Sequence, residues 1–193
     1  MRRWCRLVRY YGVDCSERDL DLAVPPEEVP QGVTIIHPGA KSPARRWPAA
    51  RFAAVARRLH SAGHRVLITG SDSERDLCVR VAELAGLDSS AVARTHLGEL
   101  AALVAGARLL ISGDTGIAHL ATAYRTPSVV LFGPVSPQRW GPPSDRPYHH
   151  AIWHGTRSER GDLPGPVHPA LLAVTEDEVL AAADQVCHAA AAQ

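Results

Sequence analysis

The residues best suited to chemistry lie in the stretch 109–119, which reads LLISGDTGIAH. A short apolar run ends in Ser112 and Gly113, and an apolar stretch with helical character follows Gly116. We therefore expect a strand, a tight turn and the start of a helix. Such a turn points backbone N–H groups and the positive end of a helix dipole at one spot, and glycine lets the backbone approach a ligand closely. The pattern predicts an anion-binding site.

The turn offers several polar groups to such an anion. Thr115 and Gly116 supply hydroxyl and backbone donors, and His119 lies one helical turn further on. The alternative is purely structural, because Asp114 and Thr115 are both residue types that favour helix N-caps. Asp-Thr-Gly also occurs in aspartic proteases, but those enzymes need an all-β surround, whereas a helix is expected here.

Two further segments carry candidate ligand-binding side chains. The basic loop 41–46 contains Lys41, Arg45 and Arg46, and guanidinium groups bind phosphates through two parallel hydrogen bonds. Glu74 opens a helix, where the dipole favours a carboxylate, and its oxygens can also accept hydrogen bonds from ribose hydroxyls. A solvated basic loop and a simple helix-start carboxylate are the structural alternatives.

Regular structure is expected from residue 33 onwards, as strands that alternate with helices. Apolar runs predict strands at residues 33–36, 65–69, 91–94, 109–111, 128–132 and 151–153. Helices are expected between them, and a last helix follows the capping box formed by Thr175 and Glu178. Continuously apolar strands are typical of parallel sheets covered on both faces. The sequence therefore predicts an α/β fold with a doubly wound, Rossmann-like parallel sheet.

Parallel sheets of this kind bind ligands at the carboxyl ends of their strands. The turns that follow the predicted strands place several polar or flexible residues at that rim: Arg45, Glu74, Asp114, Thr115 and Gly133. We expect these residues to surround one site.

The first 31 residues are expected to form a separate N-terminal helix and linker, and residues 32–193 the domain with its C-terminal helix. Leu7 and Val8 lie at helical spacing among arginines in residues 2–12, and residues 14–31 are acidic and contain three prolines. A basic amphipathic helix can lie on a membrane surface. The alternative is a helix packed on its own domain or on another one.

Composition limits the class of protein. The chain has 193 residues, is 46% hydrophobic and carries a formal net charge of +1, which indicates a packed core and argues against a nucleic-acid-binding protein. Its four cysteines are scattered, as is typical of reduced thiols, and the sequence has neither a run of 18 apolar residues nor a signal-peptide core. We expect a cytoplasmic protein.

Several kinds of chemistry are excluded because the chain lacks the motifs that they require. The chain has no G-x-S-x-G elbow, no Walker A loop, no H-E-x-x-H and no G-x-G-x-x-G after its first strand. Four histidines gather near the C-terminal half but match no known ligand spacing: His149, His150, His154 and His168. We therefore expect no metal.

Five motifs, in order along residues 33–143, together resemble glycosyltransferase family 9, the ADP-heptose heptosyltransferase family of GT-B fold. They are Ile36-His37-Pro38-Gly39-Ala40 with Arg46-Trp47-Pro48, Thr69-Gly70 with Glu74, the segment 97–107, Asp114-Thr115-Gly116-Ile117-Ala118-His119, and Leu131-Phe132-Gly133-Pro134-Val135-Ser136-Pro137. The Asp-Thr-Gly-x-x-His motif is the most specific. The matched region is similar to the C-terminal, nucleotide-sugar-binding half of the family.

The resemblance implies a role for each matching position. Arg45 replaces a lysine that contacts the diphosphate, with Lys41 nearby. Asp114 would meet the hydroxyls of the donor sugar, and Glu74 the nucleoside or sugar side. The diphosphate would be held by Thr115, Gly116, Ile117 and His119, and the adenine pocket would be lined by Thr95 and Leu97. Asp114 and Arg45 are thus the expected catalytic residues.

The resemblance also implies an inverting, metal-independent transfer of a sugar from ADP to a glycan or glycolipid acceptor, with no cofactor. The family places the acceptor and the general base in an N-terminal domain, and only about 32 residues precede the first predicted strand here. We therefore expect a truncated donor-binding half. The alternatives are a non-catalytic nucleotide-sugar-binding module and another GT-B-like enzyme, such as a nucleotide-sugar 2-epimerase.

Overall fold

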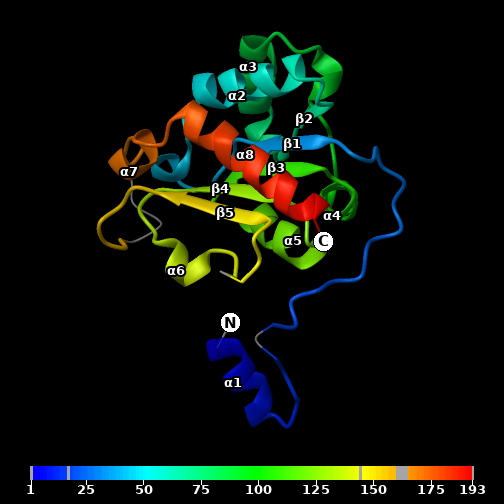
Figure 1. The fold of residues 1–193 in the computed structure, drawn as a ribbon, viewed down its shortest axis with the longest axis vertical. Helices are drawn as coiled ribbons and strands as arrows, with labels where there is room; N and C mark the ends of the chain where they lie inside the picture. The colour runs from blue at the N-terminus through cyan, green and yellow to red at the C-terminus, as the bar shows by residue number, and fades with distance from the viewer. Residues whose placement is uncertain (1, 17, 144, 160–164, 193) are drawn as a thin grey trace.

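A computed structural model describes residues 2–16, 18–143, 145–159 and 165–192 of the chain (Figure 1). In this region five parallel strands form one sheet in the order β2-β1-β3-β4-β5. The strands are β1 (Thr34–His37), β2 (Val66–Ile68), β3 (Leu109–Gly113), β4 (Ser128–Phe132) and β5 (His149–Trp153). The predicted parallel Rossmann-like sheet is confirmed.

Helices cover both faces of this sheet, as expected for parallel strands joined by crossovers (Figure 1). The helices of the described chain are α1 (Arg2–Tyr10), α2 (Ala49–Ser61), α3 (Arg75–Ala85), α4 (Leu97–Ala105), α5 (Gly116–Tyr124), α6 (Pro137–Trp140), α7 (Pro169–Leu172) and α8 (Glu176–Ala191), of which α1 lies apart from the sheet. The side chain of Thr175 accepts a hydrogen bond from the N–H of Glu178 at 3.3 Å, which confirms the predicted start of α8.

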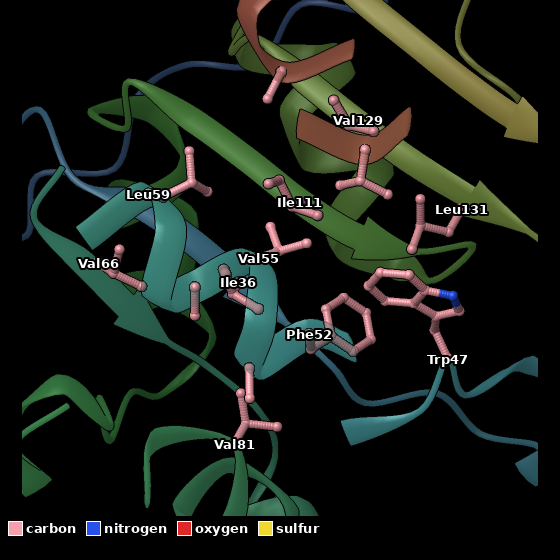
Figure 2. Close-up of a cluster of buried hydrophobic side chains, with 14 of the residues drawn as sticks. Ile36, Trp47, Phe52, Val55, Leu59, Val66, Val81, Ile111, Val129 and Leu131 are labelled. Carbon is pink, nitrogen blue, oxygen red and sulfur yellow. The ribbon is translucent and has the colours of Figure 1, made fainter. Parts of the chain in front are cut away.

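Alternate residues of each strand point to opposite faces of the sheet and pack into separate cores there. Ile36, Ile111 and Val129 pack with α2, α3 and α8 in the larger core, where the rings of Trp47 and Phe52 also meet edge to face (Figure 2). The neighbouring strand residues Ile35 and Leu110 belong to a core on the opposite face. There they pack with side chains of α4 and α5, among them Leu103, Ile117 and Ala121. Burial on both faces explains why the strands are continuously apolar.

The prediction of a strand at residues 91–94 is wrong. Val92 makes only one isolated parallel bridge, to Ile68 of β2, and the short 3-10 turn Ser89–Ala91 comes just before it. The bridge places Val92 beside the last residue of β2, and α4 begins only five residues after Val92. Conversely, β5 starts two residues earlier than expected, because His149 and His150 pair with Ser128 and Val129 of β4 despite their polar side chains.

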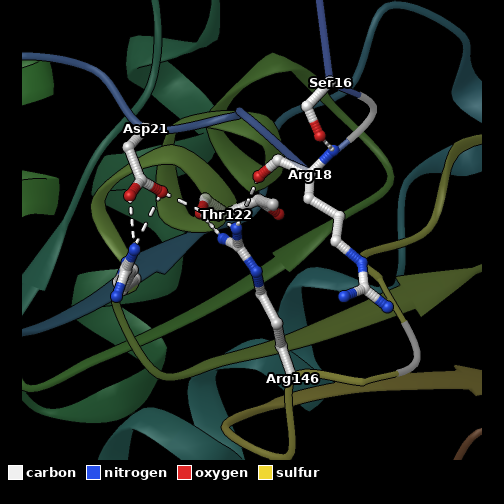
Figure 3. A network of polar contacts seen from close by, with 6 residues as sticks. Ser16, Arg18, Asp21, Thr122 and Arg146 are labelled. Carbon is white, nitrogen blue, oxygen red and sulfur yellow. Dashed lines mark hydrogen bonds and ion pairs between the residues drawn. The ribbon is translucent and has the colours of Figure 1, made fainter.

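The N-terminal segment consists of α1 and an extended linker. Figure 1 shows α1 lying apart from the α/β body, and on this helix Leu7 and Val8 are exposed whereas Cys5 is buried. The linker is fixed to the domain at Asp21, which forms ion pairs with Arg125 and Arg146 (Figure 3). Among the residues described, no helix is long and apolar enough to cross a membrane.

The strand order creates a crevice at the centre of the sheet. The chain goes from β1 outward to β2, then returns to place β3 on the other side of β1. The connections that leave β1 and β3 therefore diverge to opposite faces, and the gap outside the carboxyl ends of these two strands is where doubly wound proteins bind ligands. His37 ends β1 and Gly113 ends β3 at this point.

Candidate functional site

A cleft of about 620 Å³ opens at this crevice, a volume typical of small-molecule sites. Loops that follow four strands contribute to its lining: β1, β2, β3 and β4. The residues that line it are His37, Gly39, Ala40, Lys41, Arg45, Glu74, Asp114, Thr115, Gly116, His119, Val135, Arg139 and Trp140. The carboxyl-end rim expected from the sequence therefore surrounds one cleft, although Gly133 is not part of the lining.

The N-terminus of α5 faces this cleft without a side-chain cap. Thr115 occupies the N-cap position in an extended conformation, yet its side chain makes no capping hydrogen bond. Its Oγ1 is buried and has no hydrogen-bond partner in the described part of the chain. The capping alternative for Thr115 therefore does not hold in this structure. The first N–H groups of a helix need acceptors, so this end suits an anionic ligand.

Arg45 and Asp114 form a mostly buried ion pair beside the helix start. Nη2 of Arg45 lies 2.7 Å from Oδ2 of Asp114, and it also donates to the carbonyl oxygen of Asp114. The side chains are 22% and 9% exposed, respectively. The 3-10 turn Pro43–Arg45 carries the arginine, and the N–H of Asp114 donates to Leu131 of β4 at 3.1 Å. Backbone on both sides thus fixes the pair.

The carboxyl group of Asp114 is balanced between burial and neighbouring charge. Burial raises its pKa above the ordinary value, and the positive charges of Arg45 and His119 oppose that shift without cancelling it. His119 is exposed on the first turn of α5 and also lines the cleft. A carboxylate held in this way is a strong acceptor for ligand hydroxyls.

Glu74 contributes a second carboxylate from the β2 side of the cleft. Its Oε2 accepts hydrogen bonds from the N–H and the hydroxyl of Ser71, at 3.0 and 2.7 Å. Burial acts to raise the pKa of Glu74, but these bonds and the charges of His37 and Arg46 outweigh it, so the pKa lies below its ordinary value. Glu74 is therefore an ionised acceptor at neutral pH.

Gly39 keeps the loop after β1 in contact with Glu74. A Cβ atom built on Gly39 would lie 2.2 Å from Oε1 of Glu74, which is far inside contact distance. His37, at the end of β1, is fixed by a hydrogen bond between its Nδ1 and Oγ1 of Thr69 at 3.0 Å, and its burial lowers its pKa. The wall of the cleft between β1 and β2 is thus closely packed.

Seven of the ten candidate residues line the cleft: Lys41, Arg45, Glu74, Asp114, Thr115, Gly116 and His119. The other three lie outside the lining. Ile117 is buried in the core beneath α5, while Thr95 and Leu97 lie at the start of α4, where Leu97 is 75% exposed.

Six lining residues were not among the candidates: His37, Gly39, Ala40, Val135, Arg139 and Trp140. His37, Gly39, Ala40 and Val135 stand within the quoted motifs, which was a usable signal. Arg139 and Trp140 come from α6, inside a proline-rich loop that was not expected to contain a helix.

Three of the four clustered histidines have structural partners. Nδ1 of His149 lies 2.8 Å from Oγ of Ser128, and Nε2 of His154 lies 2.9 Å from Oε2 of Glu178. Nδ1 of His168 accepts a hydrogen bond from the N–H of Ala170 at 3.2 Å, at the start of α7. Over the ranges that the structure describes, no group of three or more His, Cys, Asp or Glu residues is arranged to hold a metal ion.

A doubly wound sheet with an uncapped helix start and a basic loop at its switch point is typical of α/β proteins that bind nucleotides or phosphates. The sequence model of glycosyltransferase family 9 (heptosyltransferase) matches residues 8–162. The chain therefore belongs to glycosyltransferase family 9, the heptosyltransferase family.

Curated relatives agree with this assignment. Lipooligosaccharide heptosyltransferase 2 of Haemophilus influenzae is 30% identical over 151 residues, which are 74% of this chain and 44% of that protein. Lipopolysaccharide heptosyltransferase 2 of Salmonella typhimurium is 31% identical over 152 residues, which are 74% of this chain and 43% of the relative. The chain thus spans less than half the length of the curated relatives it matches.

A solved structure supports the fold. The structure of E. coli ADP-heptose lps heptosyltransferase II superposes with a TM-score of 0.69 at 24% identity, over 91% of this chain and 53% of that one. This likeness agrees with the Rossmann-like sheet and indicates the fold that such a sheet has in GT-B glycosyltransferases.

Proposed function

We propose that this chain is the donor-binding half of a heptosyltransferase and holds an ADP-sugar, ADP-heptose or a close relative, in the cleft at the switch point. The single observation that carries the proposal is the start of α5. Its N-cap side chain, Thr115, makes no cap, and the buried Oγ1 has no partner in the described chain. An anion of the donor supplies the acceptor that these groups lack.

The diphosphate is proposed to lie on the start of α5. The N–H groups of Gly116 and Ile117 and the hydroxyl of Thr115 donate to it there. Ile117 can act through its backbone although its side chain is in the core. Lys41 and His119 line the same cleft and add donors around the phosphates. Arg45 contributes positive charge while it holds Asp114 in place.

The nucleoside and the sugar are proposed to lie on opposite sides of the diphosphate. Glu74 follows β2 and accepts hydrogen bonds from the ribose. Thr95 and Leu97 lie further out in the same direction, beyond the bridge from Val92 to β2, and contact the adenine outside the cleft lining. Asp114 follows the central strand β3 and accepts hydrogen bonds from the sugar's hydroxyls.

The reaction proposed for the complete enzyme is an inverting sugar transfer. An acceptor hydroxyl attacks the anomeric carbon as the bond from that carbon to the diphosphate oxygen breaks, and ADP departs with the bonding electron pair. The dipole of α5 and the cations Lys41 and Arg45 stabilise the charge on the leaving diphosphate, so that no metal or cofactor is needed. Asp114 orients the sugar during this step.

The acceptor is proposed to be a lipopolysaccharide-type glycolipid, in line with the names of the relatives. The base that takes the proton of its hydroxyl is proposed to come from a separate acceptor domain. Asp114 and Glu74, the two carboxylates that line the cleft in the described chain, already have Arg45 and Ser71 as partners. The site of the reaction is proposed to be the cytoplasm, at the membrane surface.

Isothermal titration of the chain in EDTA, with ADP, ADP-heptose and a UDP-sugar, tests this proposal. We expect saturable binding of ADP and ADP-heptose and weaker binding of the UDP-sugar. A preference for the uridine nucleotide would instead favour the epimerase-like class. Absence of binding by ADP compounds at millimolar concentration would contradict donor binding altogether. Incubation with ADP-heptose and acceptor separates an active enzyme from a binding module.

A further inference from the structure

The wall of the cleft on the β4 side is formed by α6, a single helical turn that the proposed function does not use. Arg139 and Trp140, its last two residues, both line the cleft. The other walls come from the loops after β1 and β2 and from the turn after β3. Any ligand that fills the cleft therefore lies against α6 on one side.

The position of α6 is fixed by its own backbone and by its neighbours. The hydroxyl of Ser136 caps the turn by accepting from the N–H of Gln138 at 3.3 Å, and the N–H of Ser136 donates to Oγ of Ser158 at 3.1 Å. Pro137 begins the turn. A Cβ atom on Gly141 would lie 2.5 Å from the carbonyl oxygen of Pro137, so only glycine allows this exit. The wall is therefore pre-organised.

The two residues on this wall, Arg139 and Trp140, are both exposed. Trp140 is 52% exposed, although an indole normally buries its large apolar surface. Neither its Nε1 nor the guanidinium of Arg139 makes a hydrogen bond or ion pair with any residue that the structure describes. By contrast, Trp47 is buried in the core and donates to Val174 at 3.3 Å, and Trp153 donates to Gly133 at 3.0 Å.

The order of the strands indicates which part of a nucleotide-sugar donor would contact this wall. Glu74 follows β2, the diphosphate cradle follows β3, and α6 follows β4, with β1 and β3 between β2 and β4. A nucleotide sugar whose ribose meets Glu74 and whose diphosphate lies on α5 extends its sugar toward β4. An aromatic face suits the C–H face of a sugar ring, and guanidinium N–H groups suit its hydroxyls.

We propose that Trp140 and Arg139 form the subsite for the transferred sugar, with the heptose ring stacked on the indole of Trp140 and its hydroxyls hydrogen-bonded by Arg139. This inference rests on the proposed donor function and assigns to α6 the discrimination between ADP-sugar and ADP. Asp114 holds the sugar from the β3 side, and α6 holds it from the β4 side.

Titration of ADP and ADP-heptose into the Trp140→Ala and Arg139→Ala variants tests the subsite. We expect Trp140→Ala to weaken ADP-heptose binding by about three- to tenfold while ADP affinity stays within about twofold of the wild-type value. Trp140→Phe keeps an aromatic face and should recover most of the loss. Arg139→Ala should show the same selective loss. Leu84→Ala, which removes an exposed apolar side chain of α3 outside the cleft lining, is the matched control.

Tryptophan fluorescence gives a second readout that does not depend on stability. ADP-heptose should change the emission of the wild-type protein more than ADP does, and this difference should vanish in Trp140→Phe. Equal losses for ADP and ADP-heptose, or wild-type affinities in Trp140→Ala, would overturn the sugar subsite while donor binding stands. If the wild-type chain binds neither compound, the proposed function fails first and the subsite fails with it.

Discussion

The guanidinium of Arg45 lies 2.7 Å from the carboxylate of Asp114, although 69 residues separate them in the chain. The pair links the loop after β1 to the turn after β3, at the carboxyl ends of these two adjacent strands. Because both side chains are mostly buried, each depends on the other for compensation of its charge.

We expect Arg45→Ala to reduce the free energy of unfolding by about 2 to 3 kcal/mol, because it leaves Asp114 buried without its cation. Arg58→Ala is the matched control, since Arg58 pairs with Asp177 on the surface and both side chains are exposed. That variant should lose less than about 1 kcal/mol. Urea denaturation measures both values. Similar losses in the two variants would mean that the buried ion pair contributes no more to the free energy of unfolding than the exposed one.

The hydroxyl of Thr115 is expected to bind the ligand and to contribute little to the fold. Its Oγ1 is buried and makes no hydrogen bond to the described residues, so Thr115→Ala should leave the melting temperature nearly unchanged. The same variant should weaken ADP binding by about tenfold, which is typical of one lost hydrogen bond to a charged group. Thr115→Ser keeps the hydroxyl and should bind ADP nearly as well as the wild type. Equal affinity of all three proteins for ADP would contradict this role.

Gly39→Ala is expected to act on the ligand through Glu74. The new methyl group would lie 2.2 Å from Oε1, and it would displace a flexible side chain instead of backbone. We therefore expect a small loss of stability but a several-fold loss of ADP affinity. In a Glu74→Ala background the substitution should have no further effect on affinity, because the displaced group is gone. Additive losses in the double variant would show that Gly39 acts by another route.

The acid stability of the domain should depend on His149. Burial and the nearby charge of Arg146 lower its pKa to about 4 from the usual 6.5. Between these pH values the unfolded state binds more protons than the folded state, so the free energy of unfolding falls as the pH is lowered from 6.5 toward 4. The loss attributable to this group reaches about 3 kcal/mol.

Denaturation of His149→Gln at pH 7 and pH 4.5 measures this effect, with His150→Gln as the control on the opposite face of β5. The His149 variant should show a smaller drop between the two pH values than the wild type, whatever its stability at pH 7. The His150 variant should keep the wild-type drop. An unchanged drop in His149→Gln would assign the acid sensitivity to other groups.

The sheet could be predicted because burial on both faces leaves a plain signal in the sequence. Residues such as Ile36, Ile111 and Val129 form apolar runs, and glycines or prolines separate the runs. Strand ends then place Arg45 and Asp114 at one rim by topology alone. The side-chain pairing of these two residues could not be predicted in the same way, because it depends on the conformation of the 3-10 turn that carries Arg45.

The remaining errors have local causes. Residues around Val92 have strand-like composition, but only one bridge forms there because the chain leaves β2 at once for α4. The loop that holds α6 is rich in proline, so its single turn, with Arg139 and Trp140, has no helical periodicity to detect. The anchoring of the linker through Asp21 depends on Arg125 and Arg146, which are distant in sequence.

We propose that the start of α5 binds the diphosphate of a nucleotide donor. Backbone amide shifts of Gly116 and Ile117, followed by NMR during titration with ADP and with adenosine, test this claim most directly. We predict large saturable shifts of both amides with ADP and small ones with adenosine, which lacks phosphates. Equal shifts with both compounds, or ADP-induced shifts confined to residues away from α5, would contradict it.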